Sequence, residues 1–343
     1  MMKKFCCIVF MVMLQLQVTF GQNSPLNRQQ FFLDDKVIEA TLTTDIKRLL
    51  THKKVPAWQL CNITMRFADT FVISEEIRVQ PRGIYRKLNC DIAALMLDFK
   101  NPGSPNLSPL KKLKLVGSCR IGSGNEDLLL KEYLVYKIYN LLSIMSFRVR
   151  LMHINYKDSK QKYKPYSQYA FLIEDIKDLS ERNNCREIRK KVFARDATDR
   201  EKMTVVNLFQ YMIGNTDWSI PNYHNLKLMV PKNDTFARPY VVPYDFDYAG
   251  LVDAPYAVPN SDLSITDVKE RLYKGFGRTM DELQEALTIF KEKREVIFFT
   301  VNNFSLLNVR VKDKMTRYLE EFYEIIDDKK LVRSYFISNA RTN

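Results

Sequence analysis

The spacing of the apolar residues changes near Glu174, and this change restricts the fold more than any other feature of the chain. From residue 58 to residue 174 the sequence has short apolar runs, several alternating with polar residues and all interrupted by turn residues. This pattern is typical of β-strands. From residue 175 to residue 343 the chain is mostly amphipathic helix, with apolar residues three or four positions apart. The sequence therefore predicts an α+β protein with two lobes, one β-rich and N-terminal, the other mostly helical and C-terminal.

One main helix is expected inside the β-rich lobe. Ser123 and Glu126 have the spacing of an N-terminal capping box, and the apolar residues that follow share one helix face. Glu132 falls on that face, where a carboxylate is costly unless a cation or a hydrogen-bond donor lies beside it. A second capping box, Thr279 with Glu282, is expected to begin a helix of the C-terminal lobe.

Residues 1–21 have the features of a secretory signal peptide. Lys3 and Lys4 precede an apolar run, and cleavage is expected after Gly21. Residues 22–57 are then a leader and N-terminal extension, loose up to about residue 36 and of open structure beyond it. No later segment offers the roughly 20 apolar residues that span a bilayer. We therefore expect a secreted, periplasmic or cell-surface protein without a membrane span in the mature chain; a retained N-terminal anchor is the alternative.

The charge balance favours anionic partners. The chain of 343 residues has a formal net charge of +13, which falls to +11 without Lys3 and Lys4. The basic residues are dispersed, and the densest stretch runs from Arg186 to Arg195. Such a balance suits nucleotide phosphates and acidic surface polymers. Nucleic acid is not expected as the partner of an exported protein.

Four cysteines remain after cleavage at Gly21, namely Cys61, Cys90, Cys119 and Cys185. They permit two disulfides in an oxidising compartment or four buried thiols, and the sequence leaves both open. No pair has C-x-x-C spacing and the chain has only three histidines, so a zinc site has little support.

Five polar residues stand where structure alone would favour another residue type. They are Lys114 in the middle of a strand, Glu132 on an apolar helix face, Asp217 and Asn225 in a loop after a helix, and Asp245 at the end of a strand. This order suits phosphoryl transfer. A strand Lys neutralises nucleotide phosphates, and a helix Glu holds that Lys in place. A loop Asp accepts the proton of the acceptor hydroxyl, while an Asn and a second Asp hold Mg²⁺, with Mn²⁺ as a substitute.

Each of these residues also has an ordinary structural explanation. A strand Lys commonly extends to solvent, and residues 215–217 can form a turn with an Asx hydrogen bond that Asn225 caps. Asp245 and Asp247 flank Phe246, and such close carboxylates repel each other unless a cation lies between them or one faces solvent. The ordered set, rather than any single member, indicates a phosphotransferase.

A succession of short motifs also resembles a kinase family. The motifs, spread over roughly residues 60 to 330, are QPRGIYRK, KLKLVGSCR, LLKEYLVYKIYNLL, RVRL, YAFLIED, IGNTDWS, HN and VPYDFDYAGLV. They resemble exported bacterial proteins related to the spore-coat protein CotH family of atypical kinases and, more distantly, the HipA-type kinases. The resemblance implies a protein-kinase-like fold and Mg²⁺- and ATP-dependent phosphorylation of a hydroxyl on a protein or a surface glycan.

The resemblance also implies a role for each residue of the set. They are the catalytic Asp217, the metal ligands Asn225 and Asp245, the phosphate-binding Lys114 and its ion-pair partner Glu132. The residues after Glu174 would form a hinge whose backbone groups meet the adenine.

The chain departs from ordinary protein kinases in three ways. Asp217 and Asn225 are eight positions apart instead of five, so the loop between them must bulge. The first strands contain no G-x-G-x-x-G loop, and phosphate contacts would fall to Arg82, Arg120 or bare backbone. Asp247 competes with Asp245 for the metal; Asp245 is expected to be the principal ligand, because the resemblance places the magnesium Asp first.

Other classes fit part of the pattern. In a glycosyltransferase, an Asp-x-Asp motif such as residues 245–247 binds the metal of a sugar nucleotide, but the alternating strands and helices that should precede it are not found in about the first 150 residues. A pseudokinase or surface-interaction protein would keep the fold without turnover, and the retention of all five polar residues argues against it. A serine hydrolase is not indicated, because no G-x-S-x-G motif occurs, and His224 is interpreted as structural.

Overall fold

The computed structural model describes most of the chain after residue 25. The described residues are 26–51, 57–68, 71–83, 87–88, 90–91, 94–120, 126–189, 197–234 and 236–341. The predicted signal peptide lies outside these ranges. Every helix within them is too short or too polar to cross a membrane.

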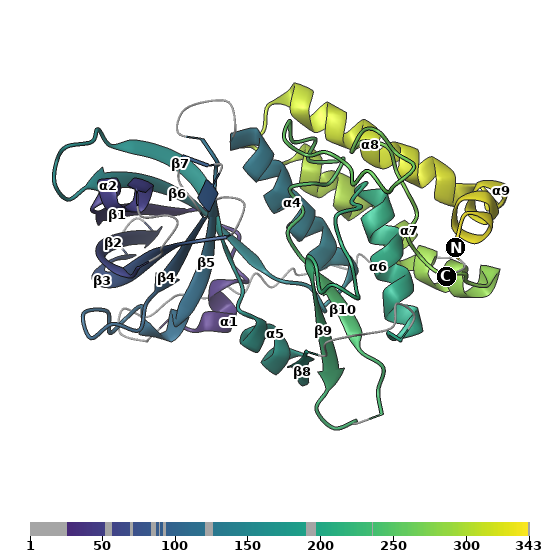
Figure 1. The fold of residues 1–343 in the computed structure, drawn as a ribbon, viewed down its shortest axis with the longest axis horizontal. Helices are drawn as coiled ribbons and strands as arrows, with labels where there is room; N and C mark the ends of the chain where they lie inside the picture. Colours follow the sequence, from purple (N-terminus) through teal and green to yellow (C-terminus); the bar gives the residue numbers. More distant parts are fainter. Residues whose placement is uncertain are drawn as a thin grey trace, which may run out of the picture.

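A closed barrel of seven strands forms the first part of the described chain (Figure 1). Its strands are β1 (Ile38–Thr44), β2 (Gln59–Ala68), β3 (Phe71–Arg82), β4 (Ala94–Asp98), β5 (Lys112–Gly117), β6 (Val149–Asp158) and β7 (Tyr166–Ile173). Around the barrel they lie in the order β1, β2, β3, β4, β5, β7, β6. β1 closes the barrel, because it pairs antiparallel with β2 and parallel with β6, where Ile38 lies opposite Met152. The segment whose structure the sequence left open therefore supplies the closing strand.

Helices and a small sheet make up the rest of the described chain. The helices are α1 (Arg28–Phe31), α2 (Ile46–Thr51), α4 (Glu126–Leu142), α5 (Ile176–Arg182), α6 (Arg200–Met212), α7 (Met280–Asn302), α8 (Val309–Asp327) and α9 (Lys329–Val332). The small sheet has the order β10 (Tyr240–Pro243), β9 (Leu226–Pro231), β8 (Cys185–Ile188). In Figure 1, α4 lies between the barrel and α6.

Alternating side chains fill the barrel and leave Lys114 outside its core. On β5, Leu113 and Leu115 belong to the hydrophobic cluster inside the barrel, as the period of two predicts. Val116, from the opposite face, packs in a second cluster outside the barrel. Lys114 shares the face of Val116, so the strand directs the lysine toward the C-terminal part of the molecule.

That second cluster joins the barrel to the helices. It combines residues of β6 and β7 with most of α4, with α6, α7 and α8, and with the small sheet. The predicted α+β class is confirmed, and the barrel has a core of its own, but the second core contains residues of both predicted lobes. The helix expected inside the β-rich lobe shares its apolar face with the C-terminal helices, because α4 packs against α7 as well as β6 and β7.

Residues 26–36 pack on the barrel and are not the loose leader expected from their polar composition. Phe31 and Phe32 are buried in the barrel cluster. Arg28 is buried as well, with its Nε 2.8 Å from Oδ2 of Asp178 in α5. Arg150 adds an ion pair of 2.7 Å with Asp34 and a hydrogen bond of 3.1 Å to the backbone oxygen of Phe31, so several contacts hold a segment whose exposed side chains are mostly polar.

Of the two predicted capping boxes, the one whose residues are both described is present in the structure. Thr279 and Glu282 form the predicted capping box at the start of α7, with hydrogen bonds of 3.3 and 2.8 Å between side chains and backbone N–H groups. Ser123 lies outside the described residues. Glu126 at the start of α4 accepts a hydrogen bond of 3.0 Å from the backbone N–H of Tyr169 in β7.

The cysteines combine the two alternatives that the sequence left open. Cys90 and Cys119 form a disulfide, whereas Cys61 and Cys185 are buried thiols. Cys119 follows β5 and Cys90 precedes β4, so the disulfide fixes the end of the strand that carries Lys114.

Candidate active site

The loop after α6 is fixed before it reaches Asp217. Gly214 has a φ of +66°, and a Cβ there would collide with the hydroxyl of Tyr318, so only glycine fits. Asn215 is 1% exposed. Its Nδ2 donates to Oε1 of Gln210 over 3.0 Å, and its Oδ1 accepts from the N–H of Asp217 over 3.0 Å. The backbone of Asp217 is thus held by a side chain anchored on α6.

Residues 217–225 form a hairpin that returns Asn225 to Asp217. Ser219 and His224 pair through two backbone hydrogen bonds of 3.1 and 3.0 Å. Asn225, at a φ of 53° that Asn tolerates, donates from Nδ2 to Oδ2 and to the backbone oxygen of Asp217, each over 2.9 Å. The expected bulge is therefore an ordered hairpin, and it brings two predicted site residues into contact.

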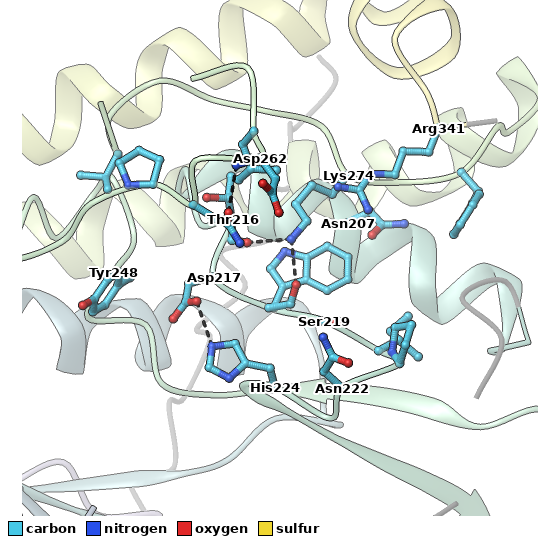
Figure 2. Close-up of a pocket in the computed structure, with 18 of the residues that line it drawn as sticks. Asn207, Thr216, Asp217, Ser219, Asn222, His224, Tyr248, Asp262, Lys274 and Arg341 are labelled. Atoms are coloured by element: carbon cyan, nitrogen blue, oxygen red, sulfur yellow. Dashed lines mark hydrogen bonds and ion pairs between the residues drawn. The ribbon is translucent and has the colours of Figure 1, made fainter. Parts of the chain in front are cut away.

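The same hairpin brings His224 to Asp217. His224 Nε2 lies 2.8 Å from Oδ1 of Asp217, and Figure 2 shows the imidazole pointing at the carboxylate. The two oxygens of Asp217 are thus each engaged, one by His224 and one by Asn225. No motif predicts the contact with His224, since it arises from the fold of the hairpin.

The segment Asp245-Phe246-Asp247 is anchored by its middle residue. Phe246 is fully buried, with its ring centroid 4.7 Å from that of Tyr136 on α4. The N–H of Asp245, at a φ of 65°, donates to the hydroxyl of Tyr136 over 2.8 Å. Asp247 accepts a hydrogen bond of 3.1 Å from Tyr256. Asp245 is exposed, whereas Asp247 is half-buried.

Backbone hydrogen bonds join the two loops into one platform. The N–H of Tyr244 donates to the backbone oxygen of Asn225 over 3.0 Å. The N–H of Gly250 donates to the oxygen of Gly214 over 3.1 Å. Asp217, Asn225 and Asp245 therefore belong to one rigid arrangement built on α6, β9 and β10.

Lys114 reaches this platform from the barrel. Its Nζ lies 5.4 Å from the ring centroid of Tyr244, the residue before Asp245. The pKa of Lys114 is lowered to about 8, chiefly by burial and then by the positive charges of Arg82 and Lys227, while Asp245 acts in the opposite direction. Lys114, Arg82 and Lys227 thus form a positive region beside Asp245, and Lys227 is a member that sequence analysis missed.

Glu132 is buried on α4, one turn before Tyr136, and is 2% exposed. The pKa of Tyr136 is raised well above its usual value, chiefly by burial and then by the negative charges of Glu132 and Asp245. Glu132 therefore lies close to the contact between Tyr136 and Asp245. Among the described residues, the contacts of Lys114 do not include the expected ion pair with Glu132.

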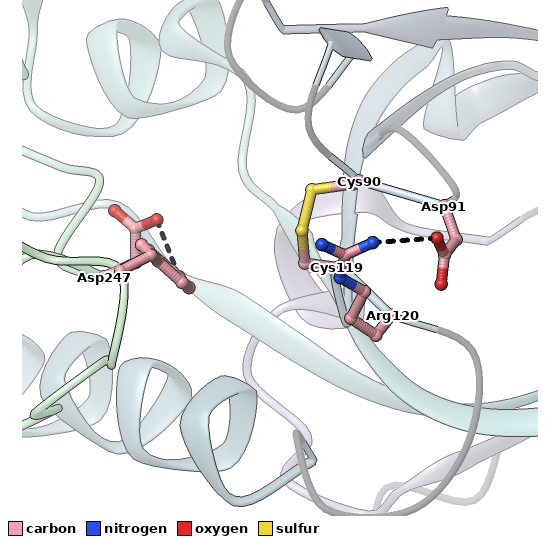
Figure 3. The surroundings of a disulfide bond; sticks show 6 residues. Cys90, Asp91, Cys119, Arg120 and Asp247 are labelled. Atoms are coloured by element: carbon pink, nitrogen blue, oxygen red, sulfur yellow. Dashed lines mark hydrogen bonds and ion pairs between the residues drawn. A yellow bond between two sulfur atoms is a disulfide. The ribbon is translucent and has the colours of Figure 1, made fainter.

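The other candidate nucleotide contacts lie around the barrel end. Arg120 pairs with Asp91 over 3.1 Å beside the disulfide, and Figure 3 shows Asp247 among the surroundings of that disulfide. Glu174 is buried, and its side chain binds Arg182 over 2.9 Å and the N–H of Arg148 over 3.0 Å. The Glu174 side chain thus has a structural role. The segment could offer the backbone groups of the neighbouring residues to an adenine ring.

A pocket of about 600 Å³ opens beside Asp217 (Figure 2). The 217–225 hairpin, α6 and the irregular segment between β10 and α7 line it. Lys274 fixes one wall, since its Nζ donates to the backbone oxygens of Thr216 and Trp218, each over 2.7 Å, and lies 4.7 Å from the Trp218 ring centroid. Among the predicted site residues that are described, Asp217 alone lines this pocket, which sequence analysis did not find.

The oxygen atoms of the platform suit a hard cation. The Nδ2 of Asn225 faces Asp217, which directs its Oδ1 elsewhere, and the carboxylates of Asp245 and Asp247 lie next along the platform. Mg²⁺ prefers such oxygen ligands, keeps several waters and needs one or two carboxylates. In the described part of the chain, no three His, Cys, Asp or Glu side chains gather into a metal site. Asn225, Asp245 and Asp247 thus offer oxygen ligands of the kind that Mg²⁺ prefers.

Comparison with known proteins leaves the family open. No protein-family model and no curated protein matches the chain. Among solved structures, it is similar to the Helicobacter pylori proinflammatory kinase CtkA, with a TM-score of 0.40 and 11% identity over 68% of this chain and 91% of that one. A TM-score this low does not establish a common fold, so the function is argued from the site itself.

Proposed function

We propose that the protein is an atypical, protein-kinase-like phosphotransferase that uses ATP and Mg²⁺ to phosphorylate a hydroxyl group. The contact between Asp217 and Asn225 carries the proposal, since it unites a candidate base with a candidate metal ligand over 2.9 Å. Tyr244 extends the unit to Asp245 and, through its ring, to Lys114. Phosphoryl transfer requires such a base, oxygen ligands and a phosphate-binding cation around one point.

Asp217 receives the proton of the acceptor hydroxyl. His224 and Asn225 hold its carboxylate in one orientation, which keeps it ready for a hydroxyl that enters from the adjoining pocket. As the hydroxyl oxygen bonds to the γ-phosphorus, its proton passes to Asp217, the bond from the γ-phosphorus to the β–γ bridging oxygen breaks, and ADP leaves.

The positive region holds the triphosphate. Lys114 is partly buried near the cations Arg82 and Lys227 as well as the carboxylates Asp245 and Asp175, and phosphate oxygens would add negative charge beside it. In the proposal, Arg82 and Arg120 take the place of a glycine-rich loop, Glu132 pairs with Lys114 when nucleotide is bound, and the backbone after Glu174 meets the adenine. Asn225 and Asp245, with Asp247 as a further ligand, would hold Mg²⁺, which would neutralise charge on the phosphates.

Export and a relationship to the CotH kinases belong to the same proposal. The disulfide between Cys90 and Cys119 supports export, because disulfides form and persist in oxidising compartments. The acceptor is then a protein or a glycan outside the cytoplasm.

Incubation of the purified protein with γ-labelled ATP and Mg²⁺ tests the proposal. We expect label transfer, or ATP hydrolysis in the absence of acceptor, which Asp217→Ala and Asp245→Ala abolish. Asp313→Ala, an exposed carboxylate on α8, is the matched control and should leave the rate unchanged. A wild-type rate no higher than that of both site variants would refute turnover.

A thermal-shift titration separates the alternatives. Stabilisation by ATP with Mg²⁺, without turnover, identifies a pseudokinase. Stabilisation by a sugar nucleotide instead of ATP identifies a glycosyltransferase.

A further inference from the structure

We propose that the pocket beside Asp217 binds the phosphate acceptor and that this acceptor is a saccharide. The inference rests on phosphoryl transfer at Asp217 and adds the class of molecule that receives the phosphate. Residues of the pocket wall carry it, and these residues are separate from the positive region around Lys114.

The pocket is larger than an amino-acid hydroxyl requires. Its volume of about 600 Å³ is in the range of sites for small molecules, and it extends from Asp217 to Asn207 on α6 and to Phe276. A serine or threonine side chain would occupy only the part next to Asp217. A disaccharide would place one hydroxyl at Asp217 and still occupy part of the remaining volume.

Two buried polar groups in the wall have no hydrogen-bond partner among the described residues. They are Oδ1 of Asn207, a residue 2% exposed, and Nε1 of Trp218, a residue 7% exposed. Native proteins seldom leave such groups unpaired, and each instance needs an explanation. One group accepts and the other donates. A hydroxyl does both, so a ligand rich in hydroxyls can satisfy both groups when the side chains that cover them move aside.

The rest of the lining has the mixed character that a saccharide presents. Neutral polar side chains line it at Thr216, Ser219, Asn222 and Asn260. Apolar surfaces line it at Ile220, Pro221, Tyr248, Val258 and Leu263. The former can bind the hydroxyls of a sugar, and the latter can pack on its C–H faces.

The pocket lacks the features by which extended peptides are commonly bound. Its lining comes from α6, the 217–225 hairpin, the irregular segment before α7 and Arg341, and includes none of the strands described above. A peptide that adds to a sheet needs an exposed strand edge. Binding of a protein acceptor by strand addition is therefore not available at this pocket.

Tryptophan fluorescence provides a direct binding test. The chain has two tryptophans, Trp58 and Trp218, so Trp58→Phe leaves Trp218 as the single reporter. Titration with glucose, galactose, xylose, N-acetylglucosamine and their disaccharides should give a saturable change in emission for at least one of them. Calorimetry should show about tenfold weaker binding of that sugar to Trp218→Phe, which keeps a ring but loses the N–H, and to Asn207→Leu. Trp58→Phe should bind it with unchanged affinity.

The acceptor assay distinguishes this inference from the proposed function. Each saccharide and a set of Ser-, Thr- and Tyr-containing peptides are offered with labelled ATP. Labelled saccharide, with a higher KM in Trp218→Phe and Asn207→Leu, supports the inference. Asp217-dependent labelling of peptides without binding of any saccharide overturns the inference and leaves the phosphotransferase standing.

Two further outcomes are also decisive. Saccharide binding at Trp218 without any use of ATP supports the pocket's ligand class and refutes the phosphotransferase. The absence of both saccharide binding and saccharide labelling in the folded wild-type protein overturns the inference. Because the two wall variants lie on different elements, misfolding of one leaves the other to decide.

Discussion

The side-chain amide of Asn225 donates a hydrogen bond of 2.9 Å to the carboxylate of Asp217, although eight positions of sequence separate them. The backbone pairing of Ser219 with His224 makes this contact possible, because it folds the intervening residues into a hairpin. The candidate base and one candidate metal ligand therefore form a single unit. A change in one is expected to disturb the other.

Replacement of Asn225 by Ala should lower both the transfer rate and the folding free energy, and a control variant separates the two effects. Loss of the amide removes a metal ligand and a donor to Asp217, and we expect the transfer rate to fall about 100-fold. The residue's φ of 53° should add a loss of about 1 kcal/mol of folding free energy. Asn184→Ala, at a φ of 49°, is the matched control for strain. Equal losses of activity in the two variants would contradict a catalytic role for Asn225.

His224 should act as a positioning residue through its donor nitrogen. His224→Leu removes the contact of 2.8 Å with Asp217 and is expected to lower kcat at least tenfold with little change in the KM for ATP. His224→Gln keeps a side-chain donor and should recover most of the rate. If the Gln and Leu variants have equally low kcat, the hydrogen bond from residue 224 to Asp217 does not determine the rate.

ATP affinity should decrease as the pH rises through about 8. The pKa of Lys114 is lowered to about 8, so its ammonium loses the proton that phosphate favours above this pH. Calorimetric Kd values on both sides of pH 8 measure the effect. Lys114→Met should bind ATP weakly with a flatter pH profile, whereas Lys112→Met, an exposed lysine on the same strand, should keep the wild-type profile. An unchanged pH profile in Lys114→Met would show that this lysine is not the source of the pH dependence.

The same lysine should destabilise the nucleotide-free protein near neutral pH. Its pKa falls from 10.5 to about 8 on folding, so the unfolded chain binds more protons between these values and stability rises with pH there. Below about pH 8 the burial penalty is fully present. Lys114→Met is therefore expected to raise the midpoint of urea unfolding at neutral pH. A lower midpoint would show that Lys114 has a stabilising partner in the free protein.

Reduction of the disulfide should weaken the barrel end that carries β5. The bond joins cysteines 29 positions apart, and its loss is expected to cost about 2–4 kcal/mol of folding free energy. Differential scanning calorimetry with and without dithiothreitol measures the shift. The variant with both Cys90 and Cys119 replaced by Ala should melt, with or without dithiothreitol, at the temperature at which the reduced wild-type protein melts. A dithiothreitol effect that persists in this variant would assign the shift to another cause.

The spacing of apolar residues predicted those elements that local sequence defines. The apolar spacing predicted strands before Glu174 and mostly helix after it, and β6, β7, α6 and α8 lie accordingly. β1 was not predicted, because its place depends on pairing with β6, which is far away in the chain. The packing of Phe31 and Phe32 likewise depends on the barrel surface that they cover.

For the site as well, the sequence predicted some of the residues but not the contacts that depend on the fold. Residue type and order identified Asp217, Asn225 and Asp245, which the structure brings together. Spacing did not reveal the hairpin, so the contact of His224 could not be predicted. Lys227 was missed because a strand lysine has no distinctive pattern until its neighbours are known.

The parallel pairing of β1 with β6 also sets the order of events during synthesis. The N–H of Ile46, just after β1, binds Oδ1 of Asp158 at the end of β6, 112 positions later. At the usual elongation rate, β1 waits on the order of ten seconds for this partner to be made. Contacts that close so long a loop also form late in folding. Until β6 is made the barrel cannot close, and β2 is the one barrel neighbour that β1 can have.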